Sequence, residues 1–344
     1  MSHNPGVEAA RERAETLSAA PPTPIEVPGG APIYVGTAGW TDATLTAPGV
    51  FYPRTATSPE ARLRYYATRF PMVEVDATYY ALQQPATVYR WIERTPGVTP
   101  RPFRFCIKAH ALLTGHPSEP QRLPADLRRA LPPAIAAKQR VYATDLPPDV
   151  MDEIRRRFAQ TVLPLASAGR LGAVLFQFPP WFGPTRENAA VLAAIKVGLG
   201  DLPIAVEFRN RDWVSDRLRD RTYALLAKHW LAYVMVDAPP GFKSSMPAPD
   251  AVAVTSPFVA VIRLHGRRTD TWEQPGASVA ERFRYLYDRT ELAPWVPRAL
   301  DAARAVREPQ FQGVHVVFNN CYANYGTTNA LEFVDLLRAP DGDG

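Results

Sequence analysis

The sequence is poor in the features that would direct a protein to a membrane, to secretion or to a structural metal. It contains two cysteines, Cys106 and Cys321, which lie far apart and form no CxxC pair, so neither a zinc motif nor a disulfide framework is expected. No apolar run approaches the roughly 20 residues that span a bilayer. The N-terminus also lacks the apolar core of a signal peptide. We therefore expect a cytoplasmic protein without a membrane partner.

Lysine is scarce as well, because arginine supplies most of the 39 cations that oppose 34 acidic residues in 344. A formal net charge of +5 is small, and the chain has no basic tract beyond Arg155, Arg156 and Arg157. The charge alone is therefore weak support for nucleic-acid binding. The sequence has neither a GxGxxG turn nor a P-loop, which disfavours a dinucleotide-binding doubly wound sheet.

What the chain does have is a repeating pattern of apolar strands and amphipathic helices. Eight short apolar runs begin near residues 34, 72, 103, 173, 204, 232, 258 and 314. Helical periodicity with start and stop signals fills most of the intervals. Eight strand-helix units in about 300 residues predict an α/β fold, a (β/α)8 TIM-like barrel over residues 33–339. Residues 1–32 are expected to form a disordered tail and residues 340–344 a flexible end.

Two intervals depart from the regular spacing. The segment of about 111–171 after the third strand is too long for one helix, so it predicts an inserted helical segment, with a helix over 149–165, that lies over the C-terminal mouth of the barrel. Residues 239–257 are rich in proline and predict a loop. One long helix is expected over 279–307.

Polar residues are concentrated where the strands should face the barrel interior. Side chains alternate along a strand, so one set faces the helices and the other faces inward. In seven of the eight strands a polar residue falls at the inward-facing C-terminal end. These strand-end residues include Glu74, Lys108, Gln177, Glu207, Arg209, Asp237, Arg263, His265 and Asn319. Because an unpaired buried charge costs several kcal/mol, this set predicts either a functional site or a self-satisfied network in which Glu207 pairs with Arg209 or Arg263 and Glu74 with Lys108.

The same residues lie in motifs that resemble a known family. The motifs are GTAGW (36–40), FYP (51–53), VEVDATYY (73–80), KAH (108–110), QFPP (177–180), VEFRNRDW (206–213), RLHGR (263–267) and FNN (318–320). Together they resemble the DUF72, or YecE-like, family, and the resemblance covers residues 34–337. It implies a TIM-like barrel and names no reaction. Ala38, Asp76 and Cys321 stand where the family commonly has serine, asparagine and histidine.

The first functional hypothesis is an enzyme, of the hydrolase or lyase class, that acts on a small anionic substrate. Glu207 would be the general base and His265 its acid or partner, while Lys108 and Asp237 complete the catalytic set. Arginine forks match phosphate and carboxylate oxygens, and aromatic or amide groups would hold the rest of the substrate. The substrate-binding residues expected on these grounds are Trp40, Tyr79, Gln177, Arg209, Arg263, Arg267, Asn319 and Asn320.

Two alternatives remain open. The barrel could be a metal-dependent phosphodiesterase that acts on nucleic acid, with Glu74, Glu207, Asp237 and His265 as ligands of a divalent metal. The arginines of the inserted segment would then follow the phosphate backbone. No local pair of residues has metal-ligand spacing, so a metal is not favoured. The third reading is a barrel that binds a ligand without turnover.

Overall fold

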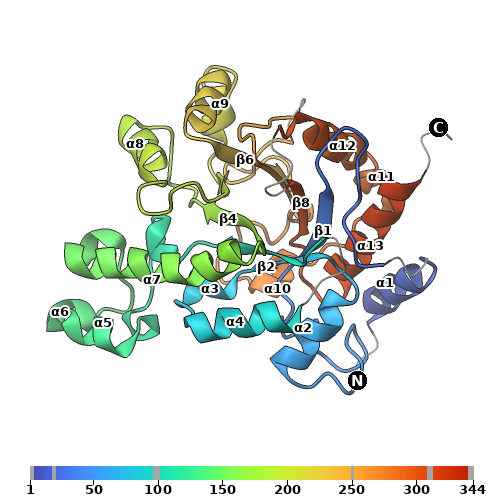
Figure 1. Ribbon diagram of the computed structural model, residues 1–344, viewed down its shortest axis with the longest axis horizontal. Helices are drawn as coiled ribbons and strands as arrows, with labels where there is room; N and C mark the ends of the chain where they lie inside the picture. The colour runs from blue at the N-terminus through green and yellow to red at the C-terminus, as the bar shows by residue number, and fades with distance from the viewer. Residues whose placement is uncertain (1–3, 18–20, 96–100, 249–251, 308–312, 340–344) are drawn as a thin grey trace.

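The computed structural model of the chain describes residues 4–17, 21–95, 101–248, 252–307 and 313–339, and within them the sheet closes into a barrel of parallel strands (Figure 1). The strands follow the chain order around the barrel, and the last pairs with the first. They are β1 (Ile33–Ala38), β2 (Met72–Val75), β3 (Arg104–Lys108), β4 (Leu171–Gln177), β5 (Ile204–Glu207), β6 (Leu231–Asp237), β7 (Val259–Leu264) and β8 (Gly313–Phe318). Every strand begins within two residues of its predicted start, so the TIM-like barrel is confirmed.

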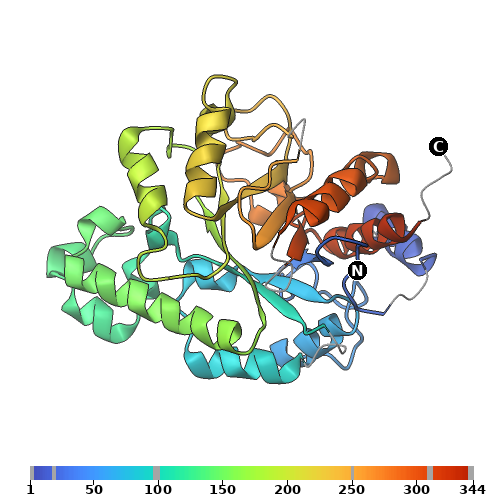
Figure 2. The same cartoon turned by 45° about the horizontal axis from the view of Figure 1, so that its top comes forward.

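Helices surround the sheet on its outer side (Figures 1 and 2). The longer ones are α1 (Pro5–Glu15), α2 (Pro59–Ala67), α4 (Pro85–Arg94), α7 (Pro148–Ser167), α8 (Arg186–Ala194), α9 (Arg219–Lys228), α12 (Trp295–Ala305) and α13 (Tyr325–Arg338). The shorter ones are α3 (Ala77–Tyr80), α5 (Ala125–Ala130), α6 (Pro133–Ala136), α10 (Val279–Arg282) and α11 (Arg289–Leu292). Four 3₁₀ turns are found in the described residues: η1 (Ala111–Leu113), η2 (Pro120–Arg122), η3 (Ala143–Asp145) and η4 (Arg211–Val214).

Local sequence signals account for where these helices begin. Ser58 caps α2 by accepting a hydrogen bond from the Ala61 amide, and Pro59 occupies the first helical position. Thr185 caps α8 in the same way through the Asn188 amide. The apolar outer faces of the strands then pack against the apolar stripes of the helices, and this packing forms one large core.

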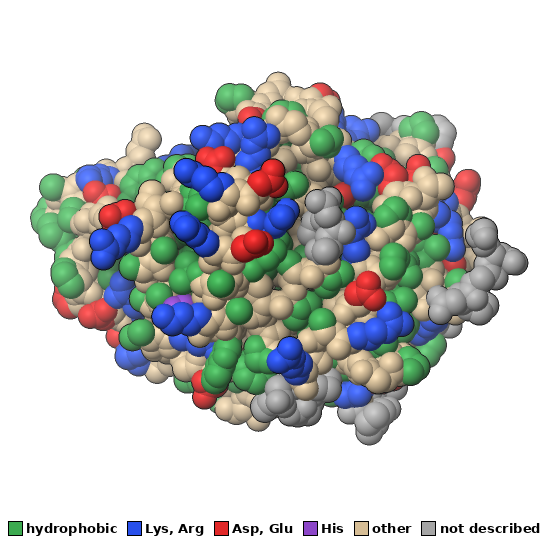
Figure 3. Space-filling model, turned by 90° about the horizontal axis from the view of Figure 1, so that it is seen from above, with side chains coloured by type: hydrophobic (Ala, Val, Ile, Leu, Met, Phe, Trp, Pro, Cys, Tyr) green, Lys and Arg blue, Asp and Glu red, His purple; other side chains and the backbone are tan. Residues whose placement is uncertain are grey.

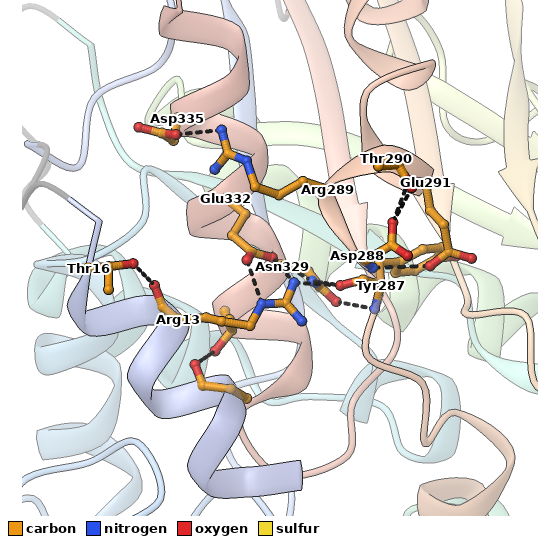
Figure 4. A network of polar contacts seen from close by, with 12 residues as sticks. Arg13, Thr16, Tyr287, Asp288, Arg289, Thr290, Glu291, Asn329, Glu332 and Asp335 are labelled. Carbon is orange, nitrogen blue, oxygen red and sulfur yellow. Dashed lines mark hydrogen bonds and ion pairs between the residues drawn. The ribbon is translucent and has the colours of Figure 1, made fainter.

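The N-terminal segment corrects the prediction of a disordered tail. Residues 5–15 form α1, which packs against α13 (Figure 4). Arg13 binds both carboxylate oxygens of Glu332 at 2.7 and 2.6 Å and also donates to the Tyr287 carbonyl. Thr328 Oγ1 donates to the Ala10 carbonyl. The proline-rich stretch that motivated the prediction lies after the helix, so its composition says nothing about residues 5–15. Residues 340–344 lie outside the described part.

The inserted segment after β3 is confirmed as helical, but it has two parts. Residues 111–147 carry η1, η2, α5, α6 and η3 around a small second apolar core, which they share with the first turns of α7 and which includes Leu123, Leu127 and Val141. α7 belongs to the outer ring of the barrel, since it packs against α4 and β4. The insertion proper is therefore shorter than the predicted 111–171.

The predicted helix over 279–307 is wrong, because the structure has three separate helices there. Asp288 caps α11 in a reciprocal capping box with Glu291, and Pro294 stands at the N-terminus of α12. Tyr287, between α10 and α11, points its hydroxyl to the buried carboxylate of Asp237 at 2.5 Å. Because new helices begin after Asp288 and Pro294, the segment cannot form one continuous helix. No helix is found in the described residues of the predicted loop at 239–257.

Candidate active site at the barrel mouth

The floor of the barrel mouth is a buried ion-pair lattice centred on Arg263. Arg263 on β7 holds Glu74 of β2 through two hydrogen bonds, Nε to Oε2 at 2.9 Å and Nη2 to Oε1 at 2.6 Å. Its Nη1 donates to Oε2 of Glu207 on β5. All three side chains are at most 1% exposed. Arg263 therefore ties three strands together and is enclosed by its two carboxylate partners.

The second carboxylate oxygen of Glu207, Oε1, contacts Gln177, Arg209 and His265. Oε1 accepts a hydrogen bond from Gln177 Nε2 at 2.7 Å and forms an ion pair with Arg209 Nε at 2.7 Å. Burial alone would raise the pKa of Glu207, but Arg263, Arg209 and His265 outweigh it and hold that pKa well below its usual range. Glu74 has one arginine partner, and burial raises its pKa. The two buried carboxyl groups thus differ in basicity.

His265 lies against the same carboxylate. Its Nε2 is 3.1 Å from Glu207 Oε1 and 3.1 Å from Arg209 Nη2, while Nδ1 is 2.8 Å from the side-chain amide of Asn319. Burial and the nearby Arg209 lower the pKa of His265 to about 3, so the ring is neutral at physiological pH. A proton assigned to Nε2 satisfies Glu207 and leaves Nδ1 to accept from Asn319.

Lys108 is the charged group of this cluster that reaches the surface without an acidic partner. Its side chain is half-buried, and Nζ lies 4.7 Å from the ring centroid of Tyr79 on α3. The expected ion pair with Glu74 is absent, and no carboxylate among the described residues pairs with this lysine. Burial and then the charge of Arg263 lower the pKa of Lys108. Arg104, at the start of the same strand, donates to the Gly169 carbonyl.

The charges of the cluster can be counted directly. The carboxylates of Glu74 and Glu207 cancel the guanidinium groups of Arg263 and Arg209, which leaves the ammonium of Lys108 as the surplus. The side chains of Gln177, Arg209 and Asn319, which contact Glu207 or His265, are half-buried and also reach the surface. The accessible face of the mouth therefore offers mainly hydrogen-bond donors, and the exposed carboxylate of Asp76 is near enough to oppose part of the charge of Lys108.

The inserted segment adds a histidine that the strand pattern did not reveal. His116 lies 5.4 Å from Tyr79 and 5.9 Å from Trp181 between ring centroids. Burial lowers its pKa to about 4, with Lys108 and Arg209 as further causes. His116 lies on the loop after η1, where no strand periodicity exists. Its position next to the KAH motif was the only available signal.

Asp237 and Arg267 do not join this cluster, which corrects their predicted place. The register pairs Asp237 with Leu264, a residue of the outer face, so Asp237 also faces the helices. There it accepts hydrogen bonds from the Tyr287 hydroxyl and from Arg267 Nε at 3.0 Å. Arg267 also forms an ion pair with Glu291 at 3.4 Å. These groups form a separate outer network that braces the loops before α12.

Two further predicted substrate ligands lie outside the mouth. Trp40 packs edge-on against Trp91 and donates its indole N–H to the Pro59 carbonyl. Asn320 is buried and donates to the Tyr285 carbonyl and to Asn329. Thr328, in the first turn of α13, donates to the Ala10 carbonyl of α1, which packs against this helix. The mouth thus brings together Glu74, Tyr79, Lys108, Gln177, Glu207, Arg209, Arg263, His265 and Asn319.

The ligands expected for a divalent metal are not assembled. Glu74 and Glu207 share Arg263 between them, and Asp237 faces outward. Within the described ranges no group of three or more His, Cys, Asp or Glu side chains is arranged to hold a metal ion.

No helix of those ranges is long and apolar enough to cross a membrane.

The arginine run on α7, which the phosphodiesterase hypothesis placed on the phosphate backbone, does not form a free basic track. Arg155 pairs with Asp152, Arg156 with Glu153, and Arg157 with Asp126 and Glu153. Figure 3 shows basic and acidic side chains interspersed over the face seen from above. Local pairing therefore neutralises this run of three arginines, whose charge a phosphate backbone would need.

Comparisons with known proteins agree with this architecture. The sequence profile described as "Protein of unknown function DUF72" matches residues 34–343. The UPF0759 protein YunF of Bacillus subtilis is 30% identical over 308 residues, which cover 89% of this chain and 94% of YunF. The UPF0759 protein YecE of Escherichia coli K12 is 26% identical over 190 residues, 55% of this chain and 53% of YecE.

Two solved structures are similar over most of the barrel. A DUF72 family protein from Thermotoga maritima has 27% sequence identity and a TM-score of 0.65, with 89% of this chain and 98% of that chain covered. A DUF72 family protein from Enterococcus faecalis has 25% identity and a TM-score of 0.66, with 90% and 97% covered. Neither description states an activity.

Proposed function

Because the chain belongs to the DUF72 family, whose description states no activity, we propose a function from the barrel mouth alone: an enzyme that binds a small phosphate- or carboxylate-bearing substrate and transfers a proton through Lys108. The observation that carries the proposal is the half-buried ammonium of Lys108, which has Tyr79 beneath it and no acidic partner among the described residues. Polar groups with perturbed pKa values at the C-terminal ends of barrel strands are typical of catalytic sites in this fold.

The proposal changes the roles expected for Glu207 and His265. Both side chains are 0% exposed, and Glu207 is fully engaged by its partners. A group must reach the substrate to exchange a proton with it. We therefore treat Glu207, Glu74 and Arg263 as positioning residues that fix Arg209 and the floor, and His265 as the link between Glu207 and Asn319.

Lys108 has the properties of a proton donor at the mouth. Burial and Arg263 lower its pKa, which brings it closer to neutral pH than an ordinary lysine. The protonated amine would attract the anion and then release its proton to an oxygen that gains negative charge in the reaction. Arg209 and the amides of Gln177 and Asn319 would orient the anion beside it.

The test compares anion binding by the native protein with that of Lys108→Met. Phosphate, sulfate and simple carboxylates should stabilise the native protein, by about 1.4 kcal/mol at a concentration ten times the dissociation constant. Lys108→Met should remove this stabilisation. Lys228→Met, which deletes an exposed lysine on α9, is the matched control and should keep it. Equal responses from all three proteins would contradict the proposal.

Turnover is the second part of the test. A variant that keeps the shape of the mouth but lacks the ammonium should bind uncharged analogues and lose the rate of any reaction found by metabolite screening. Retention of that rate in Lys108→Met would favour the ligand-binding alternative or a different catalytic group. Dependence of the rate on an added divalent metal would favour the phosphodiesterase alternative.

A further inference from the structure

A large apolar groove lies beside the mouth, between α7 and α8. It encloses about 830 Å³ and has walls that include Met151 and Phe158 of α7 and Ile195 just after α8. Phe176 and Phe178, at the end of β4, form its floor. In Figures 1 and 2 the two helices lie apart on the same side of the barrel. The volume is that of a typical small-molecule site, which is mostly apolar with few polar groups.

The rim of the groove is apolar on the surface as well. Trp181 is 61% exposed, and Val191 and Val197 are also exposed along the α8 side. The basic residues at the opposite rim, Arg155 and Arg156, are paired with Asp152 and Glu153. A continuous set of exposed apolar side chains next to a cavity marks a binding surface, and nothing at this rim offers an unpaired charge to an anion.

The groove and the mouth meet at a chain of aromatic rings. Trp181 lines the groove and lies 5.9 Å from the ring of His116, and His116 lies 5.4 Å from Tyr79. Tyr79 in turn lies 4.7 Å from Lys108 Nζ. One ligand could therefore place a charged end at Lys108 and extend over these rings into the groove.

From this continuity we infer that the substrate is amphipathic: its anionic end binds at Lys108 and Arg209, and an apolar portion of several carbon atoms lies in the groove between α7 and α8. The inference rests on the proposed function, because it takes the anion site at the mouth as its starting point. It adds the chemical class of the substrate. Trp181 and His116 become specificity-determining residues at the junction.

The experiment measures how binding depends on chain length. Linear carboxylates from acetate to dodecanoate, below their micelle concentrations, are titrated by calorimetry into the native protein. Each methylene group that enters the groove should tighten binding by up to about fourfold, until the groove is filled. The same series is run on variants that block the groove or remove the charge.

Two substitutions block the groove from different helices. Ala159→Trp on α7 and Ala194→Trp on α8 each add a ring at a lining position. Ala190→Trp is the matched control, since Ala190 is exposed on α8 and does not line the groove. Both blocking variants should bind acetate like the native protein and lose the gain with chain length, whereas the control keeps it. Using two positions guards against a fold defect in one of them.

The outcomes separate this inference from the proposed function. Loss of all carboxylate binding in Lys108→Met, with loss of only the chain-length gain in the blocked variants, supports both. Binding of acetate that depends on Lys108 but shows no chain-length gain, or a gain that both blocked variants retain, overturns the amphipathic substrate and leaves the anion site. Dodecanoate binding that does not depend on Lys108 overturns the link between the groove and the mouth. Absence of binding by every carboxylate and by phosphate overturns the proposed function itself.

Discussion

The ion-pair lattice at the mouth makes a quantitative prediction for Arg263→Met. Arg263 neutralises two carboxylates, Glu74 and Glu207, that are at most 1% exposed. Methionine fills a similar volume without charge, so both carboxylates lose their shared partner while Glu207 keeps Arg209 at 2.7 Å. Removing one partner of a buried pair costs about 3–5 kcal/mol, because a charge is left without compensation in a medium of low polarity.

The pH dependence of that cost identifies its origin. Without Arg263, the pKa of Glu74, which burial already raises, rises further, and the pKa of Glu207 rises from its low native value. At pH 7 the folded variant must therefore keep buried carboxylates charged, which destabilises it. As the pH falls toward the glutamate pKa of the unfolded chain, near 4.5, these groups are protonated and the stability is recovered. The deficit relative to the native protein should therefore shrink by about 1.4 kcal/mol per pH unit for each carboxyl that is protonated in the folded variant but still ionised in the folded native protein.

The assay is urea unfolding, followed by circular dichroism between pH 8 and pH 5. The double variant Glu74→Leu with Arg263→Met should be more stable than Arg263→Met alone at pH 7, because it also removes the carboxylate that lost both of its guanidinium hydrogen bonds. A cost below about 1 kcal/mol for Arg263→Met, or a cost that does not change with pH, would refute the buried lattice.

Three other perturbations test separate parts of the structure. Lys108→Met should raise the melting temperature at neutral pH, because a lysine with a lowered pKa destabilises the fold while it is charged. This gain in stability should fade as the pH rises toward 10.5. A loss of stability in the variant would contradict the burial of Lys108. His110, His265 and His315 are fully buried, and burial lowers their pKa values to about 4, 3 and 3, while His116 is partly buried and its pKa is lowered to about 4. These four histidines should make the unfolding free energy fall by about 5 kcal/mol per pH unit between roughly pH 6 and pH 4.5. His315→Phe should reduce that slope by about 1.4 kcal/mol per pH unit, and an unchanged slope in urea titrations would refute its neutral state. Arg13→Ala should cost about 1–3 kcal/mol in the same assay, because buried Glu332 loses a bidentate partner, and no change would mean that α1 is not docked on α13.

The barrel and much of its floor could be predicted from the sequence because both depend on short-range patterns. Strand spacing fixed the number of strand-helix units, and alternation placed Glu74, Glu207, Arg263 and His265 inside. The same reasoning failed for Asp237. A strand shifted by one residue exchanges its two faces, and the register with Leu264, which sets the face, is a property of two strands.

Contacts between distant segments could not be predicted in this way. Which carboxylate would take Arg263 depends on the relative heights of three strands around a closed barrel. His116 reaches Tyr79 from a loop without periodicity, and α1 is held by Arg13 and Glu332, which are 319 residues apart. In each case the contact joins residues that are far apart in the sequence, and local sequence patterns do not indicate such contacts.

The most direct test of the central claim is the titration of Lys108 itself. The sequence has five lysines, so carbon-13 labelling of the lysine ε-carbons gives a simple NMR spectrum in which Lys108→Met assigns the resonance. We predict that Lys108 titrates below the usual lysine pKa of about 10.4, and that saturating phosphate shifts its resonance and raises its pKa while the Lys228 resonance is unaffected. An ordinary lysine titration that phosphate leaves unchanged would contradict an anion site at the barrel mouth.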